Sequence, residues 1–141
     1  SNHSLVVVVE RVTRQVHIKR LVGKKASDTS TKIISILKKY PKNLLKTITY
    51  DNGIEFAFHD VVNYELDMRS YFCDPYSAWQ KGTVENINGL IRRFFPKGTD
   101  FDLISDAELQ LVEDWINNRP MKVLNFKTPN EMFTELTGVA V

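Results

Sequence analysis

The amino-acid sequence predicts an α/β domain in which a sheet is flanked by helices. Three observations favour this class: two strand-like apolar runs open the chain, helical and strand-like segments alternate through its middle, and helices close it. The chain has 141 residues, 43% of them hydrophobic, which is enough for one domain with its own core. We therefore expect residues 1–141 to form a single domain.

Two adjacent segments at the start of the chain predict a β-hairpin. Leu5–Val9 is a continuous apolar run rich in β-branched residues, which is typical of a strand buried on both faces. Gln15–Val22 follows a short polar turn and alternates apolar with polar residues, as expected of the second strand. His17 lies on the polar phase of this alternation, so we expect its side chain to face solvent.

The next segment predicts a helix followed by a third strand. Ser27 or Asp28 can cap the helix, which ends before Pro41. Thr47–Asp51 predicts the strand, with Asp51 at its carboxyl end, and an Asn-Gly turn breaks the strand directly afterwards. The apolar residues of the helix are Ile33, Ile34, Ile36 and Leu37.

Another helix, a fourth strand and a long helix are predicted in the following part. Residues 56–66 have helical spacing, and Met68–Cys73 is strand-like. Residues 74–82 predict a loop that carries Trp79, and a helix is expected from Val84 up to a Pro-Lys-Gly turn. The apolar residues on one face of that helix are Val84, Ile87, Leu90, Ile91, Phe94 and Phe95.

The last two helices are predicted from capping signals. Ser105 with Glu108 predicts a capping box at the start of one helix. Thr128 with Glu131 predicts a second capping box, and Pro129 would occupy the first helical position.

Composition excludes several classes of protein. Cys73 is the single cysteine, which excludes a disulfide framework and gives no zinc-site spacing. No apolar run approaches the length of a membrane span, and no signal-peptide pattern opens the chain. We expect a soluble protein of the reducing cytoplasm with no membrane partner.

Charge is distributed unevenly along the chain. Residues 1–46 hold eleven of the 19 lysines and arginines but two acids, whereas residues 47–141 hold eight cations and fifteen acids. A phosphate-binding face beside an acidic metal site would produce this asymmetry. Lysines on solvated helix faces would explain it equally well.

Two carboxylates are candidates for metal chemistry. Asp51 ends a strand at the rim where α/β sheets place ligands, although Asp-Asn-Gly is also an ordinary turn sequence. Glu85 projects opposite the apolar stripe of its helix together with Asn88 and Arg92, although such a polar face is usually just solvated. If the two carboxylates converge, they repel unless they are protonated or bridged by a cation such as Mg²⁺.

The motifs around these carboxylates resemble a known family. Residues 49–56, TYDNGIEF, resemble the second-aspartate motif of DDE transposases and retroviral integrases. Residues 72–89, FCDPYSAWQKGTVENING, are similar to the glutamate motif of bacterial insertion-sequence transposases, and the 34 positions between Asp51 and Glu85 match the family's spacing. Three later stretches fit as well: FPKGTDF at 95–101, NNRP at 117–120 and KTP at 127–129.

The resemblance implies a fold and a mechanism. It implies an integrase or transposase catalytic core with a ribonuclease-H-like mixed sheet, in which Asp51 and Glu85 bind Mg²⁺ or Mn²⁺ with a third carboxylate. Two metal ions would activate a water or a DNA 3′-hydroxyl for in-line displacement, so one site would cut the element ends and join them to target DNA. It also implies a homo-multimer that acts on chromosomal DNA in the bacterial cytoplasm.

Further residues around the two carboxylates are candidates for supporting roles. We expect Asn88 and Arg92 to contact DNA phosphates. Trp79 is a candidate for stacking on DNA bases and Lys81 for a phosphate contact, the alternatives being packing of the loop for Trp79 and simple exposure for Lys81. In a second layer, Asn52 and Glu55 would support the metal ligands, with exposure as the alternative for Glu55.

One departure from the family pattern concerns the first aspartate. In the family it lies on a central strand upstream of the one that matches Leu5–Val9, so we expect a truncated, inactive fragment that binds Mg²⁺ weakly. Glu10 is a weak substitute, because the family has an acidic residue there in addition. The flanking strands 5–9 and 47–51 are expected to close up, or to be separated by a segment of another chain, since unpaired buried backbone is costly.

Two other functions remain open at this stage. One is a non-catalytic DNA-binding or assembly remnant of a transposase. The other is a structure-specific nuclease of the same fold, which would cut DNA without joining it to a target.

Overall fold

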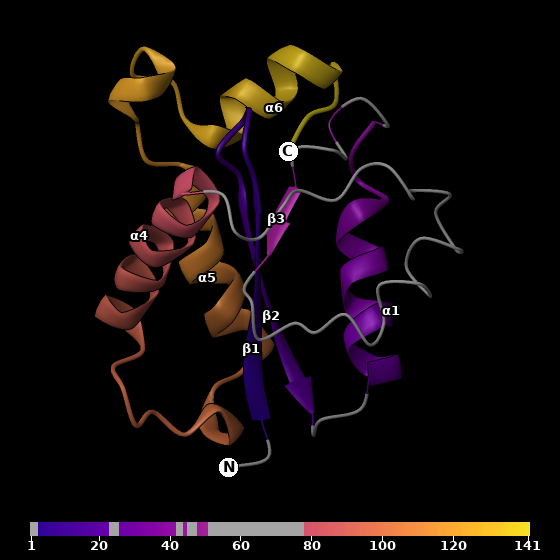
Figure 1. Ribbon diagram of the computed structural model, residues 1–141, viewed down its shortest axis with the longest axis vertical. Helices are drawn as coiled ribbons and strands as arrows, with labels where there is room; N and C mark the ends of the chain where they lie inside the picture. The colour runs from indigo at the N-terminus through magenta and orange to yellow at the C-terminus, as the bar shows by residue number, and fades with distance from the viewer. Residues whose placement is uncertain (1–2, 23–25, 42–43, 45–47, 51–77) are drawn as a thin grey trace.

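The computed structural model describes residues 3–22, 26–41, 44, 48–50 and 78–141, and it shows a small sheet between helices (Figure 1). The strands are β1 (His3–Glu10), β2 (Val16–Val22) and β3 (Ile48–Tyr50). The helices are α1 (Ala26–Leu37), α4 (Ala78–Phe94), α5 (Asp106–Asn117) and α6 (Pro129–Thr137), with short 3-10 helices η2 (Phe101–Leu103) and η3 (Lys122–Leu124). The predicted mixture of a sheet and flanking helices is confirmed.

The described sheet has the order β2-β1-β3, with both neighbouring pairs antiparallel. β1 and β2 form the predicted hairpin, in which Val9 pairs with Val16 and Val7 with Ile18. The buried Glu10 carboxylate holds the hairpin turn by accepting hydrogen bonds from the backbone N–H groups of Val12 and Thr13. Glu10 therefore stabilises its own turn in this structure.

β1 also pairs directly with β3, through Val8–Tyr50, Val9–Thr49 and Glu10–Ile48. The prediction that these two strands close up on each other is confirmed. The ribonuclease-H-like topology and the missing central strand stay predictions. The predicted helix at 56–66 and the predicted strand Met68–Cys73 lie outside the described residues.

The two faces of β1 pack against different helices. Side chains alternate along a strand, so Val7 and Val9 share one face while Val6 and Val8 share the other. The first pair belongs to the main core with α4 and α5, and α1 lies on the opposite side of the sheet (Figure 1). All four valines are at most 5% exposed, which confirms the predicted strand buried on both faces. The members of the main core are Val7, Val9, Val16, Ile18, Ile87, Ile91, Phe95, Ile104, Leu109, Val112 and Ile116.

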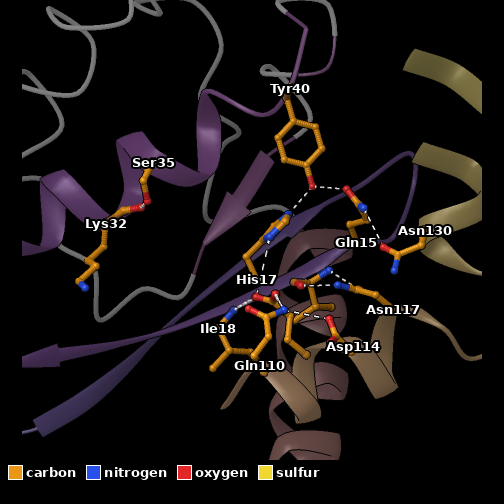
Figure 2. A network of polar contacts seen from close by, with 12 residues as sticks. Gln15, His17, Ile18, Lys32, Ser35, Tyr40, Gln110, Asp114, Asn117 and Asn130 are labelled. Atoms are coloured by element: carbon orange, nitrogen blue, oxygen red, sulfur yellow. Dashed lines mark hydrogen bonds and ion pairs between the residues drawn. The ribbon is translucent and has the colours of Figure 1, made fainter. Parts of the chain in front are cut away.

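Side chains of α5 cover the outer edge of β2. Asn117 Oδ1 accepts a hydrogen bond from the Val16 N–H, and Asn117 Nδ2 donates one to the Val16 carbonyl, each at 2.8 Å. Glu113 Oε1 accepts from the Ile18 N–H at 2.8 Å (Figure 2). These bonds pair backbone groups that an edge strand otherwise leaves open. The edge of the sheet is thus closed by two side chains one helical turn apart.

His17 is buried, so the prediction of a solvent-facing side chain is wrong. His17 pairs with Val8 on the face of the sheet that α1 covers, and its Nε2 lies 2.5 Å from the Tyr40 hydroxyl (Figure 2). The alternation along β2 was correct, but both faces of this strand are covered. A residue on the polar phase of the β2 alternation is therefore not exposed to solvent here.

The starts of α5 and α6 agree with the predictions, because the residues that cap each of these helices lie close together in the sequence. Ser105 caps α5 by accepting from the Glu108 N–H, and Thr128 and Glu131 form the full capping box of α6, with Pro129 in the first turn. By contrast, α1 begins at Ala26, which places the predicted caps Ser27 and Asp28 inside the helix. Within the described residues, no helix combines the length and hydrophobicity that a bilayer span requires.

Candidate metal and nucleic-acid site

β3 precedes one of the two predicted carboxylates in the sequence, α4 carries the other, and these two elements contact each other. Asp51 directly follows Tyr50, the last residue of β3, and itself lies outside the described residues, as do Asn52 and Glu55. Glu85 lies in the first half of α4, and α4 contacts β3. The strand that leads into Asp51 therefore packs against the helix that carries Glu85.

α4 starts earlier than the sequence indicated. It begins at Ala78, so Trp79 and Lys81 lie in its first turns and the predicted loop over residues 78–82 is wrong. Gly82 was interpreted as a loop residue, but one glycine inside a helix costs only about 1 kcal/mol, and the contact of α4 with the sheet offsets that. The side chains of residues 78–85 lie outside the described part of the chain, so the roles of Trp79, Lys81 and Glu85 stay predictions.

Asn88 and Arg92 lie one turn apart on α4, beside its buried stripe. Ile87 and Ile91 are 4% and 5% exposed, whereas Asn88 is half-buried and Arg92 exposed. Both polar side chains line a hollow of about 320 Å³ between α4, β1 and the chain after the helix. Asn88 and Arg92, the two residues predicted to contact phosphates, therefore line the same cavity.

The opposite wall of this hollow comes from a turn that sequence reasoning treated only as the end of a helix. Lys97 and Thr99 line the cavity together with Asn88 and Arg92. The Thr99 N–H donates to the Pro96 carbonyl at 3.0 Å, and Gly98, with φ +91°, adopts the left-handed conformation that this turn requires. The Pro-Lys-Gly motif predicts the turn, but the place of Lys97 at the hollow depends on how α4 packs against β1.

A second hollow, of about 350 Å³, lies beside a buried polar network, of which Gln15, His17 and Asn130 line the hollow. Figure 2 shows this network. The Tyr40 hydroxyl donates to Gln15 Oε1 at 2.6 Å and accepts from His17 Nε2. Gln15 Nε2 in turn donates to Asn130 Oδ1 at 3.0 Å. The network joins the end of α1, the hairpin and α6, and no sequence signal pointed to it.

The environment of this network fixes the ionisation of two groups. Burial, with smaller contributions from the nearby Lys39 and Lys19, lowers the pKa of His17 to about 3. Burial likewise raises the pKa of Tyr40. His17 is therefore neutral near pH 7. Its Nδ1 lies 3.9 Å from Glu113 Oε1 and accepts no hydrogen bond from the residues that the structure describes.

Comparison with known proteins identifies the class to which these motifs point. Curated relatives at 38–42% identity over nearly all of this chain are transposases of bacterial insertion sequences. The resemblance drawn from the sequence motifs is confirmed, and the chain is a relative of insertion-sequence transposases. No family model matches the chain, and no solved structure matches it significantly.

Three of these relatives illustrate the match. The transposase of insertion sequence IS4351 from Bacteroides fragilis is 42% identical over 137 residues, which cover 96% of this chain and 42% of the relative. Transposase InsI of IS30A from Escherichia coli is 41% identical over 140 residues, 99% of this chain and 36% of the relative. The IS1086 transposase of Cupriavidus metallidurans is 39% identical over 130 residues, 92% and 38% respectively. This chain thus spans about two fifths of the length of its relatives.

Proposed function

We propose that this chain is the catalytic core of an insertion-sequence DDE transposase of ribonuclease-H-like fold. In this proposal the enzyme cuts the ends of a DNA element and joins them to target DNA, works as a homo-multimer and acts in the bacterial cytoplasm. The observation that carries the proposal is the identity to transposases along nearly the whole chain, in which β3 leads into Asp51 and packs against the helix of Glu85.

Asp51 and Glu85 have the chemistry that the expected cofactor requires. Carboxylate oxygens are the donors that Mg²⁺ and Mn²⁺ prefer, and the resemblance adds a third carboxylate to these two. When bound, a pair of such ions supplies an activated oxygen nucleophile and stabilises the leaving oxygen. Asn52 and Glu55, close to Asp51 in sequence, would orient the ligands.

The remaining candidates on α4 would hold the substrate. Arg92 is exposed and Asn88 half-buried, so both are available to donate hydrogen bonds to phosphate oxygens. Lys81 lies one turn before Glu85 on the same helix, where it would add a further phosphate contact. Trp79, in the first turn of α4, would stack on a DNA base.

The test is a strand-transfer assay with the full-length protein, element-end DNA and Mg²⁺ or Mn²⁺. Asp51→Asn and Glu85→Gln keep shape but remove charge, and each is expected to lower the rate by about a thousandfold or more, because a lost metal ligand removes several kcal/mol of transition-state stabilisation. Glu108→Gln, which changes an exposed carboxylate on α5, is the matched control and should leave the rate unchanged.

DNA binding, measured on the same variants, separates the outcomes. Retained binding with lost transfer supports the proposal. Cleavage without joining in the wild-type protein would identify a nuclease of the same fold, and binding without any cleavage would identify a non-catalytic DNA-binding module. Undiminished transfer by Glu85→Gln would contradict the assignment of the site.

A further inference from the structure

We propose that the hollow between α4, β1 and residues 96–101 holds one unpaired nucleotide of the DNA substrate. Its phosphate would bind Arg92 and Lys97, and its base would lie against the apolar floor. The inference rests on the proposed function, since it assumes that DNA is the substrate, but it concerns Arg92, Lys97 and the apolar residues beside them and not the two carboxylates.

The lining of the hollow combines the two chemistries of a nucleotide. Its rim carries the cations Arg92 and Lys97 and the hydrogen-bonding side chains of Asn88 and Thr99, and among the described residues that line it there is no aspartate or glutamate. Such a rim favours a phosphate. The apolar lining residues are buried or half-buried whereas Arg92 and Lys97 are exposed, so the apolar side chains form the floor and the cations the rim. The floor residues are Leu5, Val7, Ile91, Phe95 and Phe101.

The second hollow differs from this one in the charges of its lining residues. The two cavities have similar volumes, about 320 and 350 Å³. The second is lined by Glu113 and Asp114 with Lys39 as the cation, so a phosphate there would meet two like charges at close range. Of the two hollows, the one beside α4 is suited to a nucleic-acid ligand.

The walls of the hollow are held in place before any ligand arrives. The Phe101 ring packs edge-on against Phe95, with ring centroids 6.3 Å apart, and remains half-buried. The Arg20 guanidinium donates to the backbone carbonyls of Phe101 and Ile104 and pairs with Asp106 at 3.1 Å, which fixes the short helix η2 to the sheet. A preformed site loses little conformational freedom when it binds.

The size and the floor of the hollow favour an unpaired nucleotide over duplex DNA. A cavity of this volume holds one small organic group. A base within a duplex exposes its edges but not its faces, so its ring becomes available to an apolar surface only when it leaves the stack. Duplex DNA could contact the rim cations alone.

The first experiment measures binding of the 141-residue chain to three labelled DNAs by fluorescence anisotropy. These are a single strand, a blunt duplex, and the same duplex with an unpaired 3′ overhang. Lys97→Gln is compared with Lys122→Gln, an exposed lysine of η3 that does not line the hollow. Lys97→Gln should weaken binding of the single strand and of the overhang about tenfold and lower the single-strand salt slope by about 0.7, as loss of one phosphate contact does.

Lys122→Gln should change neither quantity, and Lys97→Gln should weaken binding of the blunt duplex less than binding of unpaired DNA, since a duplex can reach only the rim cations. Phe101→Leu keeps an apolar floor but removes the ring, and it should weaken binding of unpaired DNA by about fivefold or more while the salt slope stays the same. Thermal unfolding of each variant, followed by circular dichroism, verifies that the fold is intact.

The second experiment maps the base directly. A 5-iodouracil in the overhang is irradiated in the complex, and the cross-linked peptide is identified by mass spectrometry. The expected peptide contains Phe101. If Lys97→Gln behaves as Lys122→Gln does, or if the cross-link maps to a peptide that does not line the hollow, the inference is overturned. Neither result affects the proposed function, which is tested by the Asp51 and Glu85 variants.

Discussion

His17 shows how the covering of one side chain changes its chemistry. The imidazole lies under α1, donates to the Tyr40 hydroxyl and faces Glu113 with a nitrogen that has no hydrogen-bond partner among the described residues. Because burial lowers the pKa of His17 to about 3, the folded protein keeps the ring neutral at pH values where an exposed histidine is charged.

This shift predicts a loss of stability in mild acid. Between pH 6.5 and pH 3 the unfolded chain binds a proton at His17 and the folded protein does not, so the free energy of unfolding falls as the pH falls through this range. From pH 6.5 to pH 5 the loss should be about 1.6 kcal/mol, because the slope rises from about half of 1.4 kcal/mol per pH unit at pH 6.5 to nearly all of it at pH 5.

Urea denaturation at a series of pH values measures this loss, with His17→Gln as the comparison. The variant is expected to be less stable at pH 7, because the fit around Tyr40 is disturbed, but to lose less stability on acidification. Equal slopes for both proteins would show that His17 does not carry the effect.

Single residues also show which features could not be predicted from the sequence. The alternation along β2 gave the correct strand but the wrong environment for His17, because α1 covers a face that the pattern alone assigns to solvent. Lys97 was interpreted only as part of a turn, since its place at the hollow depends on how α4 packs against β1. Asp51 and Glu85 were predicted from a strand end, a helix face and the motifs around them, and these assignments stay predictions because the two side chains lie outside the described part of the chain.

At the scale of elements, α5 completes the sheet without being a strand. Asn117 offers Val16 one acceptor and one donor, which is the pair of bonds that a neighbouring strand would supply. Glu113 adds an acceptor for Ile18 one turn earlier. The helix therefore packs against the sheet and also closes its edge.

We predict that Asn117→Leu lowers the free energy of unfolding by about 3 kcal/mol. Leucine is similar in size but leaves the buried N–H and carbonyl of Val16 without partners, and each such group costs about 1–3 kcal/mol. Asn118→Leu, at the neighbouring position, is the control and should cost less than about 1 kcal/mol, because the hydrogen bonds of the Asn118 side chain, to the Asp114 carbonyl and from Asn130, are exposed to solvent. Chemical denaturation measures both, and equal effects would contradict the edge-closing role.

Elements were predicted best where their signals are local. The hairpin of β1 and β2 and the caps Ser105 and Thr128 each depend on residues within a few positions of one another, and all are present. The start of α4 was missed by several residues because Gly82 weakens the local helical signal, and packing against the sheet decides the outcome.

For the whole molecule, the two seams of the sheet differ in how a helix holds them. Among the described residues, seven pairs join β1 to β2 and three join β1 to β3. Since Asn117 and Glu113 also bind the backbone of β2 to α5, the β1–β2 hairpin should open at higher free energy than the β1–β3 seam.

Hydrogen exchange followed by mass spectrometry tests this order. Amides of residues 48–50 should exchange faster than those of β2 by about a hundredfold or more, which corresponds to a difference of about 3 kcal/mol in opening free energy. The buried edge of β2, which Asn117 and Glu113 cover, should be among the slowest sites. Equal protection of the two seams would show that the sheet opens as one unit.

The side-chain closure of β2 bears on how a mutational scan of this protein is interpreted. Position 117 needs a short amide that both donates and accepts, and position 113 needs an acceptor that reaches the strand, so few of the twenty amino acids will serve at either. Both sites should tolerate substitution as poorly as catalytic residues do. Poor tolerance of substitutions at these two positions would come from the need to close the edge of the sheet. Poor tolerance alone would therefore not identify a residue as catalytic.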